Sequence, residues 1–243
     1  MPQVYDASLA IACPMANEAD TAIPFVKQVL DACQSVQKVT FFAVVDNATK
    51  DNTVELLRDY ANTEPRLVVV WAPENRCVVD AYMRGYREAL ASGAEWILEI
   101  DGGFSHDPGN IPQFFPYMAQ NYDCVFGSRF TKGGSITSSS FRRRVVSWGG
   151  TLLTNALIGT NLTDMTSGFE MFRRDVLQNV LDRGIHSQAH FFQTEIKVHC
   201  RNLKIAEVPI QYHMASPRLS GGPVGEAFTQ LWRLFKLRLA GRL

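Results

Sequence analysis

Groups of polar side chains follow several apolar runs of this sequence, at the points where those runs end. Three such groups are present: Pro14–Glu18, Asp46 with Asn47, and Asp101. A carboxylate at such a place can accept hydrogen bonds from a nucleotide base or a ribose, or ligate Mg²⁺ or Mn²⁺ beside a diphosphate. Any one of them could instead cap the next helix. Their recurrence at several run ends favours a ligand-binding site.

A second group of chemically useful side chains is basic. The segment from Cys124 to Thr163 contains no acidic residue, and its basic residues are Arg129, Lys132, Arg142, Arg143 and Arg144. The part from Thr131 to Ser140 is rich in Gly, Ser and Thr, which predicts a loop. Guanidinium forks match the oxygen geometry of phosphates. The segment predicts contact with an anionic substrate, and a solvated linker leading into a helix near Arg142 is the alternative.

The net charge of zero conceals two halves of opposite sign. The chain has 243 residues with 24 Lys and Arg against 24 Asp and Glu. Residues 1–107 hold 16 acidic and 8 basic side chains, and residues 108–243 hold 8 acidic and 16 basic. Local fields steer ligands even when a whole chain is neutral. The two halves are therefore expected to meet different partners.

Composition excludes several protein classes. A content of 46% apolar and 20% charged residues is typical of a globular protein. No apolar run approaches the roughly 18–20 residues that span a bilayer, and the N-terminus does not resemble a signal peptide. The five cysteines form no C-x-x-C pair, which speaks against a disulfide framework or a zinc site. We expect a cytoplasmic protein.

The scaffold that positions these groups alternates strand and helix patterns. We predict strands over Ser8–Cys13, Val39–Val45, Leu67–Trp71, Trp96–Ile100 and Asp123–Phe126. Apolar residues at helical spacing follow the first three of them. Near-continuous apolar strands of this kind indicate a mostly parallel sheet with helices on both faces. Ligands of such sheets bind beyond the carboxyl ends of the strands, where the polar groups fall.

Seven short motifs, in order, resemble those of family 2 glycosyltransferases of the GT-A fold. They look most like the branch that glycosylates dolichyl and other polyprenyl phosphates. The motifs are Pro14–Glu18 (family P-x-x-N-E), Val45–Thr53 (D-D-x-S-x-D-x-T), Ile100–Pro108 (D-A-D-L-S-H-x-P), Gly127–Phe130, Thr166–Phe169, Phe192–Glu195 and Glu207–Ile210. The resemblance covers most of the chain and implies an α/β, Rossmann-like GT-A domain followed by a C-terminal amphipathic helix.

The resemblance also implies how the chain is divided. We expect a GT-A domain over 1–215, with a nucleotide-sugar half at 1–127 and an acceptor half at 128–215. Residues 216–243 are expected to form a phosphate-loop-like segment and a basic amphipathic helix. The residues expected to bind a GDP- or UDP-linked sugar are Pro14, Asn17, Glu18, Asp46, Asn47, Arg76 and Asp101.

The metal site departs from the family pattern at Gly103, which replaces the second carboxylate of D-x-D. Residues i and i+2 of an extended segment face the same side, so a D-x-D motif presents two carboxylates to one ion. Mg²⁺ often takes only one or two protein carboxylates. We therefore predict Mg²⁺ or Mn²⁺ at Asp101, with Ser105, Glu99 or Asp107 as further ligands. A weakened or absent metal site, in a nucleotide-binding pseudoenzyme, is the alternative.

The resemblance implies a polyprenyl phosphate as acceptor. The residues expected to bind its phosphate are Arg129, Arg142, Arg143 and Arg218, the last in a segment that resembles the family's phosphate loop. A phosphate monoester carries about 1.5 to 2 negative charges and needs no strong base to react. A hydroxyl acceptor would need a carboxylate, and Asp164 or Glu195 would then be the candidate. Asp164 could equally anchor the Thr166–Phe169 turn.

We take Asp101, Arg129 and Glu195 as the catalytic candidates of an inverting hexosyltransferase. A glycan or a modified nucleic-acid base remains an alternative acceptor, because a basic half also attracts polyanions. The inversion of the anomeric centre is implied by the resemblance alone.

The C-terminal segment Glu226–Leu243 predicts a basic amphipathic helix. Its apolar residues at helical spacing are Phe228, Leu231, Trp232, Phe235 and Leu239, interleaved with Arg233, Lys236, Arg238 and Arg242. Such a helix can lie on anionic lipid headgroups or pack on the protein core with its arginines in solvent. Both interpretations stay open, so the protein is expected to be soluble or peripherally bound to a membrane.

Overall fold

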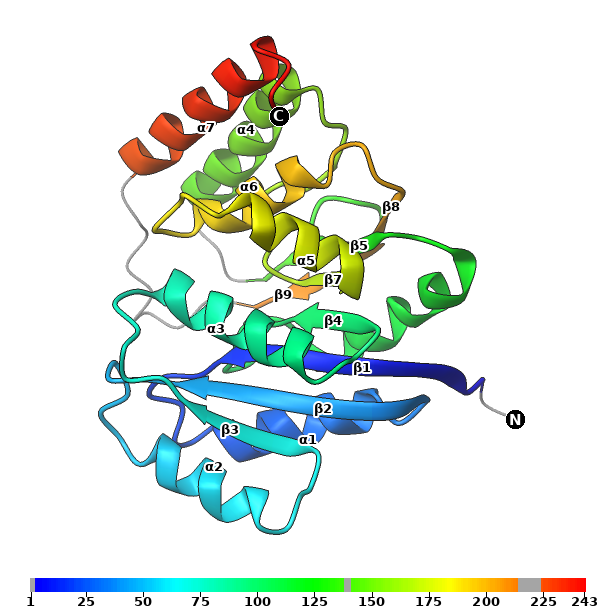
Figure 1. Ribbon diagram of the computed structural model, residues 1–243, viewed down its shortest axis with the longest axis vertical. Coiled ribbons are helices and arrows are strands. Elements are labelled where there is room, and N and C mark those ends of the chain that lie inside the picture. The colour runs from blue at the N-terminus through cyan, green and yellow to red at the C-terminus, as the bar shows by residue number, and fades with distance from the viewer. Residues whose placement is uncertain (1–2, 138–140, 214–223) are drawn as a thin grey trace.

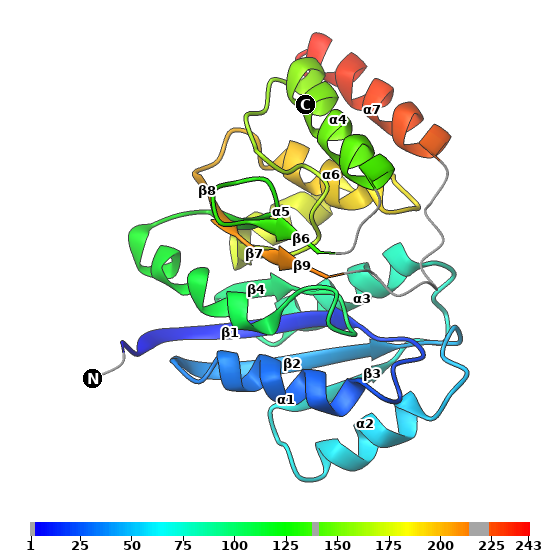
Figure 2. The ribbon, with the colours of Figure 1, turned by 180° about the vertical axis from the view of Figure 1, so that it is seen from behind.

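The computed structural model describes residues 3–137, 141–213 and 224–243, and it is built around one seven-stranded sheet (Figures 1 and 2). The strand order across the sheet is β3-β2-β1-β4-β7-β5-β8. The strands are β1 (Tyr5–Pro14), β2 (Val36–Val45), β3 (Leu67–Trp71), β4 (Trp96–Glu99), β5 (Cys124–Ser128), β7 (Glu170–Arg173) and β8 (Ile205–Pro209). Two short strands, β6 (Ser135–Ile136) and β9 (Gln211–Tyr212), pair separately.

The mostly parallel sheet confirms the predicted fold class. All five predicted strands are present, and β1 pairs in parallel with β2 and β4. The apolar runs of these strands are buried, as is typical of a parallel sheet covered on both faces. Strand β7 was not predicted, and it pairs antiparallel with both β4 and β5. Its four residues, Glu-Met-Phe-Arg, are too short and too polar at their ends to give a strand pattern.

Helices cover both faces of the sheet (Figures 1 and 2). One core cluster joins the sheet to α1 and to two 3₁₀ segments, and a second joins it to α3, α5 and α6. The elements are α1 (Ala22–Ala32), α2 (Thr53–Ala61), α3 (Val78–Ala91), α4 (Phe141–Ile158), α5 (Arg174–Arg183), α6 (Phe191–His199), α7 (Val224–Leu239), η1 (Pro108–Gln113) and η2 (Phe115–Gln120).

The two predicted halves share this sheet. The expected division between residues 127 and 128 falls inside β5, and β7 and β8 also come from the second half. The other expected boundary, at 215, lies outside the described residues. Both halves therefore contribute to one continuous scaffold.

The C-terminal helix α7 packs against α4 and α6 at one end of the molecule (Figure 1). Leu231 and Leu234 of α7 are buried there with Ile158, Met165 and Val198. Other apolar residues of α7 face away from this cluster, so the helix has both a packed and an exposed apolar side. Within the described residues, no helix has the length and apolarity needed to cross a bilayer.

The packing of α7 predicts an asymmetry between two leucines of the same helix. Leu234 is 0% exposed and Leu239 is 72% exposed. Replacing Leu234 by Ala leaves a cavity in the cluster and should lower the free energy of unfolding by about 2–5 kcal/mol. The matched control Leu239→Ala should change it by less than about 0.5 kcal/mol. Chemical denaturation measures both, and equal effects would show that α7 does not pack as described.

Candidate active site

The loops that follow β1 and β2 are joined to each other by Asn17. Its side-chain amide donates to the Ala48 carbonyl at 3.0 Å, and its carbonyl oxygen accepts from the Lys50 N–H at 2.8 Å. Asn17 has φ of 59°, a left-handed conformation that Asn adopts more readily than most residues. The predicted donor residues Pro14–Glu18 are thereby held against the loop that carries Asp46.

Asp46 and Asn47 connect that loop to the one after β3. Asp46 accepts from the Ala48 N–H at 2.9 Å and from the Asn75 side chain at 3.2 Å, and Asn47 donates to the Pro73 carbonyl at 2.8 Å. Arg76, on the same third loop, is 86% exposed and pairs with Asp80 at 3.1 Å. The predicted donor residues thus lie on adjacent loops at the carboxyl edge of the sheet.

Asp101, just beyond β4, is surrounded by three side chains. The Tyr82 hydroxyl donates to Oδ1, while the Ser105 hydroxyl lies 3.5 Å and His106 Nδ1 lies 3.6 Å from Oδ2. Burial lowers the pKa of His106, an effect that the nearby Asp101 opposes, so the imidazole is neutral near pH 7. The sequence indicated Tyr82 only as part of a helix face. His106 lies within the Ile100–Pro108 motif, but the sequence pattern did not indicate a role for it.

Tyr212 links the surroundings of Asp101 to those of Arg129. Its ring centroid lies 5.2 Å from that of His106, and the Arg129 guanidinium carbon lies 5.4 Å from the same Tyr212 centroid. The backbone of this region is also joined, because the His213 N–H donates to the Ser105 carbonyl at 2.8 Å. Strand β9 and His213 therefore lie next to the loop that carries Asp101. Arg218 itself lies outside the described residues.

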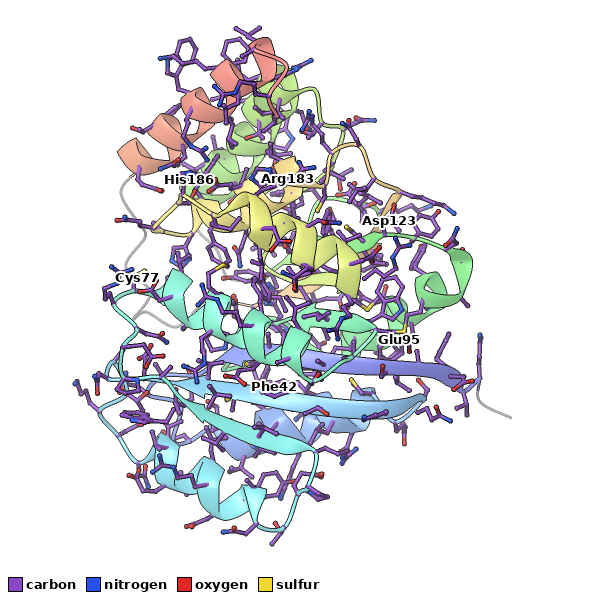
Figure 3. The ribbon with its side chains drawn as sticks, viewed as in Figure 1. Phe42, Cys77, Glu95, Asp123, Arg183 and His186 are labelled. Atoms are coloured by element: carbon purple, nitrogen blue, oxygen red, sulfur yellow. The ribbon has the colours of Figure 1, made fainter. Side chains whose placement is uncertain are left out.

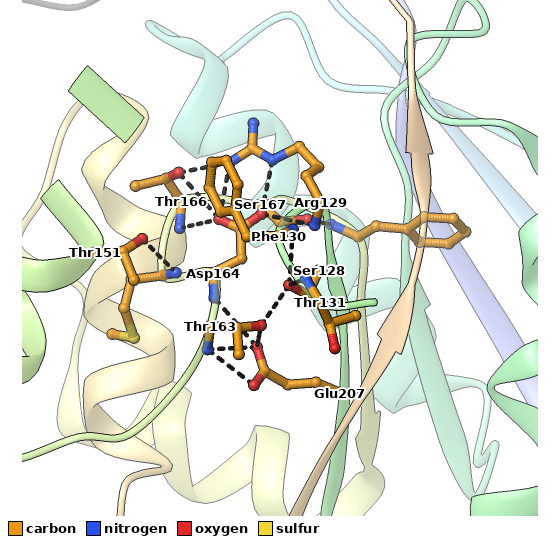
Figure 4. Close-up of polar contacts among 12 residues, drawn as sticks. Ser128, Arg129, Phe130, Thr131, Thr151, Thr163, Asp164, Thr166, Ser167 and Glu207 are labelled. Carbon is orange, nitrogen blue, oxygen red and sulfur yellow. Dashed lines mark hydrogen bonds and ion pairs between the residues drawn. The ribbon is translucent and has the colours of Figure 1, made fainter. Parts of the chain in front are cut away.

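Arg129 forms a two-pronged ion pair with Asp164 (Figure 4). Its Nε donates to Oδ2 at 2.7 Å and its Nη2 to Oδ1 at 2.8 Å, and Nη2 also reaches the Thr166 hydroxyl at 2.6 Å. Both side chains are nearly or fully buried. Burial raises the pKa of Asp164, but the Arg129 charge and its hydrogen bonds outweigh this and lower it to about 2. Asp164 is therefore ionised, and its contacts favour the anchoring role over that of a general base.

Neighbouring side chains hold the turn that carries Asp164. The Glu207 carboxylate on β8 accepts from the Thr163 N–H at 2.9 Å and from its hydroxyl at 2.8 Å (Figure 4). The buried Lys197 ammonium on α6 donates to the carbonyls of Asp164 at 3.2 Å and Ser167 at 2.6 Å. The turn is thus fixed from both β8 and α6.

Glu99, predicted as an additional metal ligand, lies elsewhere. It is fully buried, accepts from the Gln193 amide at 2.7 Å and faces Glu170 across the β4–β7 pair. Burial and the neighbouring Glu170 raise the pKa of Glu99 well above its usual range. The carboxyl group therefore favours its protonated form, which is a poor cation ligand, and we withdraw Glu99 from the metal set.

Glu195 lies on the other side of α6 from Gln193 and Lys197. Two residues along a helix turn a side chain to the opposite face, while four residues return it. Glu195 accepts from the Ser187 N–H at 2.9 Å, from its hydroxyl at 2.6 Å and from Arg233 of α7. His186, at the start of this loop (Figure 3), donates its N–H at 3.2 Å. The contact with Arg233 ties α6 to α7, and none of these contacts reaches Asp101.

The remaining basic candidates are only partly described. Arg142 and Arg143 fall in the first turn of α4, and their side chains lie outside what the structure describes. Arg144, next to them, is exposed and donates to the Ile136 carbonyl. This bond of Arg144 joins the start of α4 to β6.

The donor set at Asp101 fits a hard divalent cation with few protein ligands. The Asp101 carboxylate is 23% exposed and the Ser105 hydroxyl is its neighbour. Asp107 instead accepts from the Gly109 N–H at 2.8 Å and caps η1. Across the described ranges, no three His, Cys, Asp or Glu side chains gather in a way that could hold an ion. Mg²⁺ and Mn²⁺ tolerate one or two carboxylates when phosphate oxygens complete the shell.

The mostly parallel sheet with helices on both faces is the GT-A fold, which solved glycosyltransferases share. Glucosyl-3-phosphoglycerate synthase from Mycobacterium tuberculosis, solved with Mn²⁺, UDP-glucose and phosphoglyceric acid, superimposes with a TM-score of 0.63. The match covers 95% of this chain and 80% of that one at 14% identity. The likeness therefore concerns the fold.

The chain belongs to glycosyl transferase family 2, whose family model matches residues 10–181. An undecaprenyl-phosphate mannosyltransferase from Micrococcus luteus is 31% identical over 195 residues, which are 78% of this chain and 80% of that protein. A polyprenol monophosphomannose synthase from Mycolicibacterium smegmatis is 26% identical over 236 residues, which are 95% and 86% of the two chains. The resemblance in sequence motifs is thus confirmed, and the chain is an enzyme of this family.

The buried ion pair yields a stability prediction. Replacing Asp164 by Asn leaves the Arg129 charge buried without its partner and should lower the free energy of unfolding by about 3–5 kcal/mol near pH 7. The pKa of Asp164 is lowered from about 3.9 in the unfolded chain to about 2. Its contribution is therefore present above pH ~4 and is lost as the pH falls through about 2.

Urea denaturation of both proteins between pH 7 and pH 3 measures this difference, which should be constant down to about pH 4.5 and then shrink. The control is Asp175→Asn, because Asp175 pairs with Arg173 at 2.6 Å but is 60% exposed. Its loss should cost less than about 1 kcal/mol. Similar losses for the two variants would contradict the buried pair.

Proposed function

We propose that this enzyme transfers a hexose from a GDP- or UDP-linked donor to a polyprenyl phosphate at a membrane surface. Family membership supports the donor, and the names of both curated relatives support the acceptor. The structural observation that carries the acceptor is a group of exposed apolar side chains on α4 and α7, two helices that pack against each other. A sugar acceptor dissolved in water would not require such a surface.

The donor side of the proposal rests on the loops after β1, β2 and β3, which hydrogen bonds join to one another, and on Asp101 in the loop after β4. Asp46 and Asn47 would meet the base, and Asp101 would meet the ribose and, with Ser105, hold Mg²⁺ or Mn²⁺ against the diphosphate. A divalent cation so bound stabilises the negative charge that develops on a departing diphosphate. The Tyr82 hydroxyl donates to Oδ1 of Asp101 and would hold the carboxylate in position for the cation.

The acceptor side rests on the basic segment after β5. An acceptor phosphate oxygen is already negatively charged, so it can attack the anomeric carbon while the bond to the diphosphate breaks, without a strong base. Arg129 has Nε and Nη2 committed to Asp164 and Thr166, so its Nη1 is the atom we assign to the phosphate. Arg142, Arg143 and Arg218 complete the proposed set. Glu195 is not retained among the catalytic candidates, because its carboxylate is buried among other partners.

The exposed surface of α4 and α7, here called the apolar surface, has contributions from both helices. Its members are Val145, Val146, Trp148, Leu152 and Leu153 of α4 with Phe228, Trp232 and Leu239 of α7. Helices α4 and α7 pack against each other, so these side chains belong to one end of the molecule (Figures 1 and 2). Apolar patches bordered by polar residues mark contacts with proteins or membranes.

Basic side chains and position favour a membrane as the partner of the apolar surface. Lys236, Arg238 and Arg242 on and after α7 are partly or largely exposed beside it, as suits anionic headgroups. The first turns of α4 and α7 lie toward the edge where β1, β2 and β4 end (Figures 1 and 2). A lipid phosphate at the bilayer surface would therefore be presented to the site. We propose that the enzyme meets the membrane from its cytoplasmic side.

The transfer reaction is tested by measuring the release of GDP or UDP from a panel of GDP- and UDP-sugars, with and without polyprenyl phosphate and Mn²⁺. We expect turnover that requires a polyprenyl phosphate, with Asp101→Asn lowering it at least about 100-fold because the cation and the ribose lose a ligand. Turnover that ignores polyprenyl phosphate but needs a glycan would refute the proposed acceptor. Binding of nucleotide without any turnover would support a pseudoenzyme instead.

The apolar surface is tested by sedimentation with vesicles of phosphatidylcholine and phosphatidylglycerol. Trp148→Glu with Trp232→Glu places two charges where the headgroups would lie, and should weaken vesicle binding by about tenfold or more. Trp71→Glu is the control, because Trp71 is a similarly exposed tryptophan on β3. Unchanged vesicle binding by the double variant would show that this end does not meet the membrane.

A further inference from the structure

Gly103, the position where the second metal-binding carboxylate is missing, lies directly against Glu18. Gly103 has φ of +81°, in the left-handed region. A Cβ atom at residue 103 would lie 2.6 Å from Oε2 and 2.8 Å from Oε1 of Glu18, closer than real Cβ atoms approach other atoms. The carboxylate of Glu18 therefore occupies the space in which a side chain at residue 103 would begin.

Several bonds hold Glu18 in this place. Its N–H donates to the Thr53 hydroxyl at 2.8 Å, its carbonyl accepts from the Ala22 N–H at 2.7 Å, and its Oε2 accepts from the Thr21 hydroxyl. The carboxylate is thus fixed at the start of α1 and does not rest there as a mobile surface group. Its other oxygen, Oε1, also lies close, 2.8 Å from the position of a Cβ atom at residue 103.

The loop after β4 packs closely on the loop after β1. A Cβ atom at Gly102 would lie 3.1 Å from the Pro14 carbonyl oxygen. Asp101 and Glu18 also share a neighbour, the Cys13 thiol. Burial is the largest cause that raises the pKa of this thiol, and the negative charges of Asp101 and Glu18 are the next largest. Two carboxylates from different loops thus flank the end of β1.

We propose that Glu18 supplies the second carboxylate that Gly103 lacks, and that Glu18 and Asp101 together hold the divalent cation of the donor diphosphate. This inference rests on the proposed function, since the cation serves the nucleotide sugar. The carboxylate reaches the site from the loop after β1 instead of from two residues further along the same loop. Gly103 is then required, because any side chain there would displace the Glu18 carboxylate.

Glu18 also has a structural explanation, namely that it only fastens the start of α1 through Thr21. The two roles are separated by Glu18→Gln and Thr21→Val. Gln keeps the length of the side chain and an oxygen that can accept from Thr21, but it has no negative charge for a cation. Val removes the hydroxyl and keeps the Glu18 carboxylate with its negative charge.

The test is Mn²⁺ binding in the presence of GDP, and in a second series UDP, followed by the electron paramagnetic resonance signal of free Mn²⁺. We expect Glu18→Gln to weaken Mn²⁺ binding at least about tenfold, and Thr21→Val to change it by no more than about twofold. Metal-free nucleotide affinity, measured by calorimetry for each protein, separates loss of the cation from loss of a nucleotide contact: in Glu18→Gln the Mn²⁺ affinity should fall by a larger factor than the metal-free nucleotide affinity. Wild-type affinity in Glu18→Gln, or an equal loss in Thr21→Val, would overturn the inference.

A carboxylate exchange gives a second, independent measurement. Glu18→Gly alone should lose Mn²⁺ affinity, and Glu18→Gly combined with Gly103→Asp should regain at least about fivefold, because the space beside residue 103 is then open. Failure to regain any affinity in a folded double variant would also count against the inference. So would a wild-type protein that binds no Mn²⁺ with either nucleotide.

The outcomes separate this inference from the proposed function. An enzyme that glycosylates polyprenyl phosphate but whose Glu18→Gln variant binds Mn²⁺ normally would refute the inference alone. A chain that turns over no donor would refute the proposed function, and the Mn²⁺ affinities would still decide the role of Glu18.

Discussion

The structure depends on neutralising the charge of Arg129 inside the protein. An unpaired buried guanidinium would be costly, and Asp164 meets it with two parallel hydrogen bonds. The pair fastens the end of β5 to the turn at residues 163–167, which Glu207 and Lys197 hold from β8 and α6. Because Arg129 also lies over Tyr212, which contacts His106, the position of the Asp101 loop is coupled to the same ion pair.

The antiparallel strand β7 creates a second electrostatic constraint beneath the site. It places Glu170 opposite Glu99, so two carboxyl groups meet in the core. Burial raises the pKa of Glu170 to about 7, although the Lys197 ammonium, 3.2 Å away, acts in the opposite direction. Two buried carboxylates cannot both be ionised cheaply, so Glu99 holds the proton and accepts from Gln193, while Glu170 faces Lys197. This arrangement fixes the end of β4 two residues before Asp101.

Helices α6 and α7 are joined by both polar and apolar contacts. Glu195 binds Arg233 of α7, and Leu231 and Leu234 pack beside Val198 of α6. The two interpretations of the C-terminal helix are therefore compatible, because one side of α7 is buried in a cluster with Ile158 and Val198 while Phe228, Trp232 and Leu239 are exposed. The opposite charges of the two halves also gain a setting: carboxylates lie on the loops after β1, β2 and β4, and basic side chains lie on the segment that leads to α4 and on α7.

The sequence by itself determined the parallel strands, the polar groups at their carboxyl ends and the family. Long apolar runs and motifs at strand ends are local patterns, so they can be recognised without knowing which elements pack together. It did not reveal β7, whose four residues become a strand only between β4 and β5. It also could not give the face of α6 on which Glu195 lies, the contact of His106 with Asp101, or the contact of Glu18 with Gly103. Each of these depends on side chains brought together by packing between separate elements, and only the tertiary structure decides which of the available partners a buried or half-buried charge will meet.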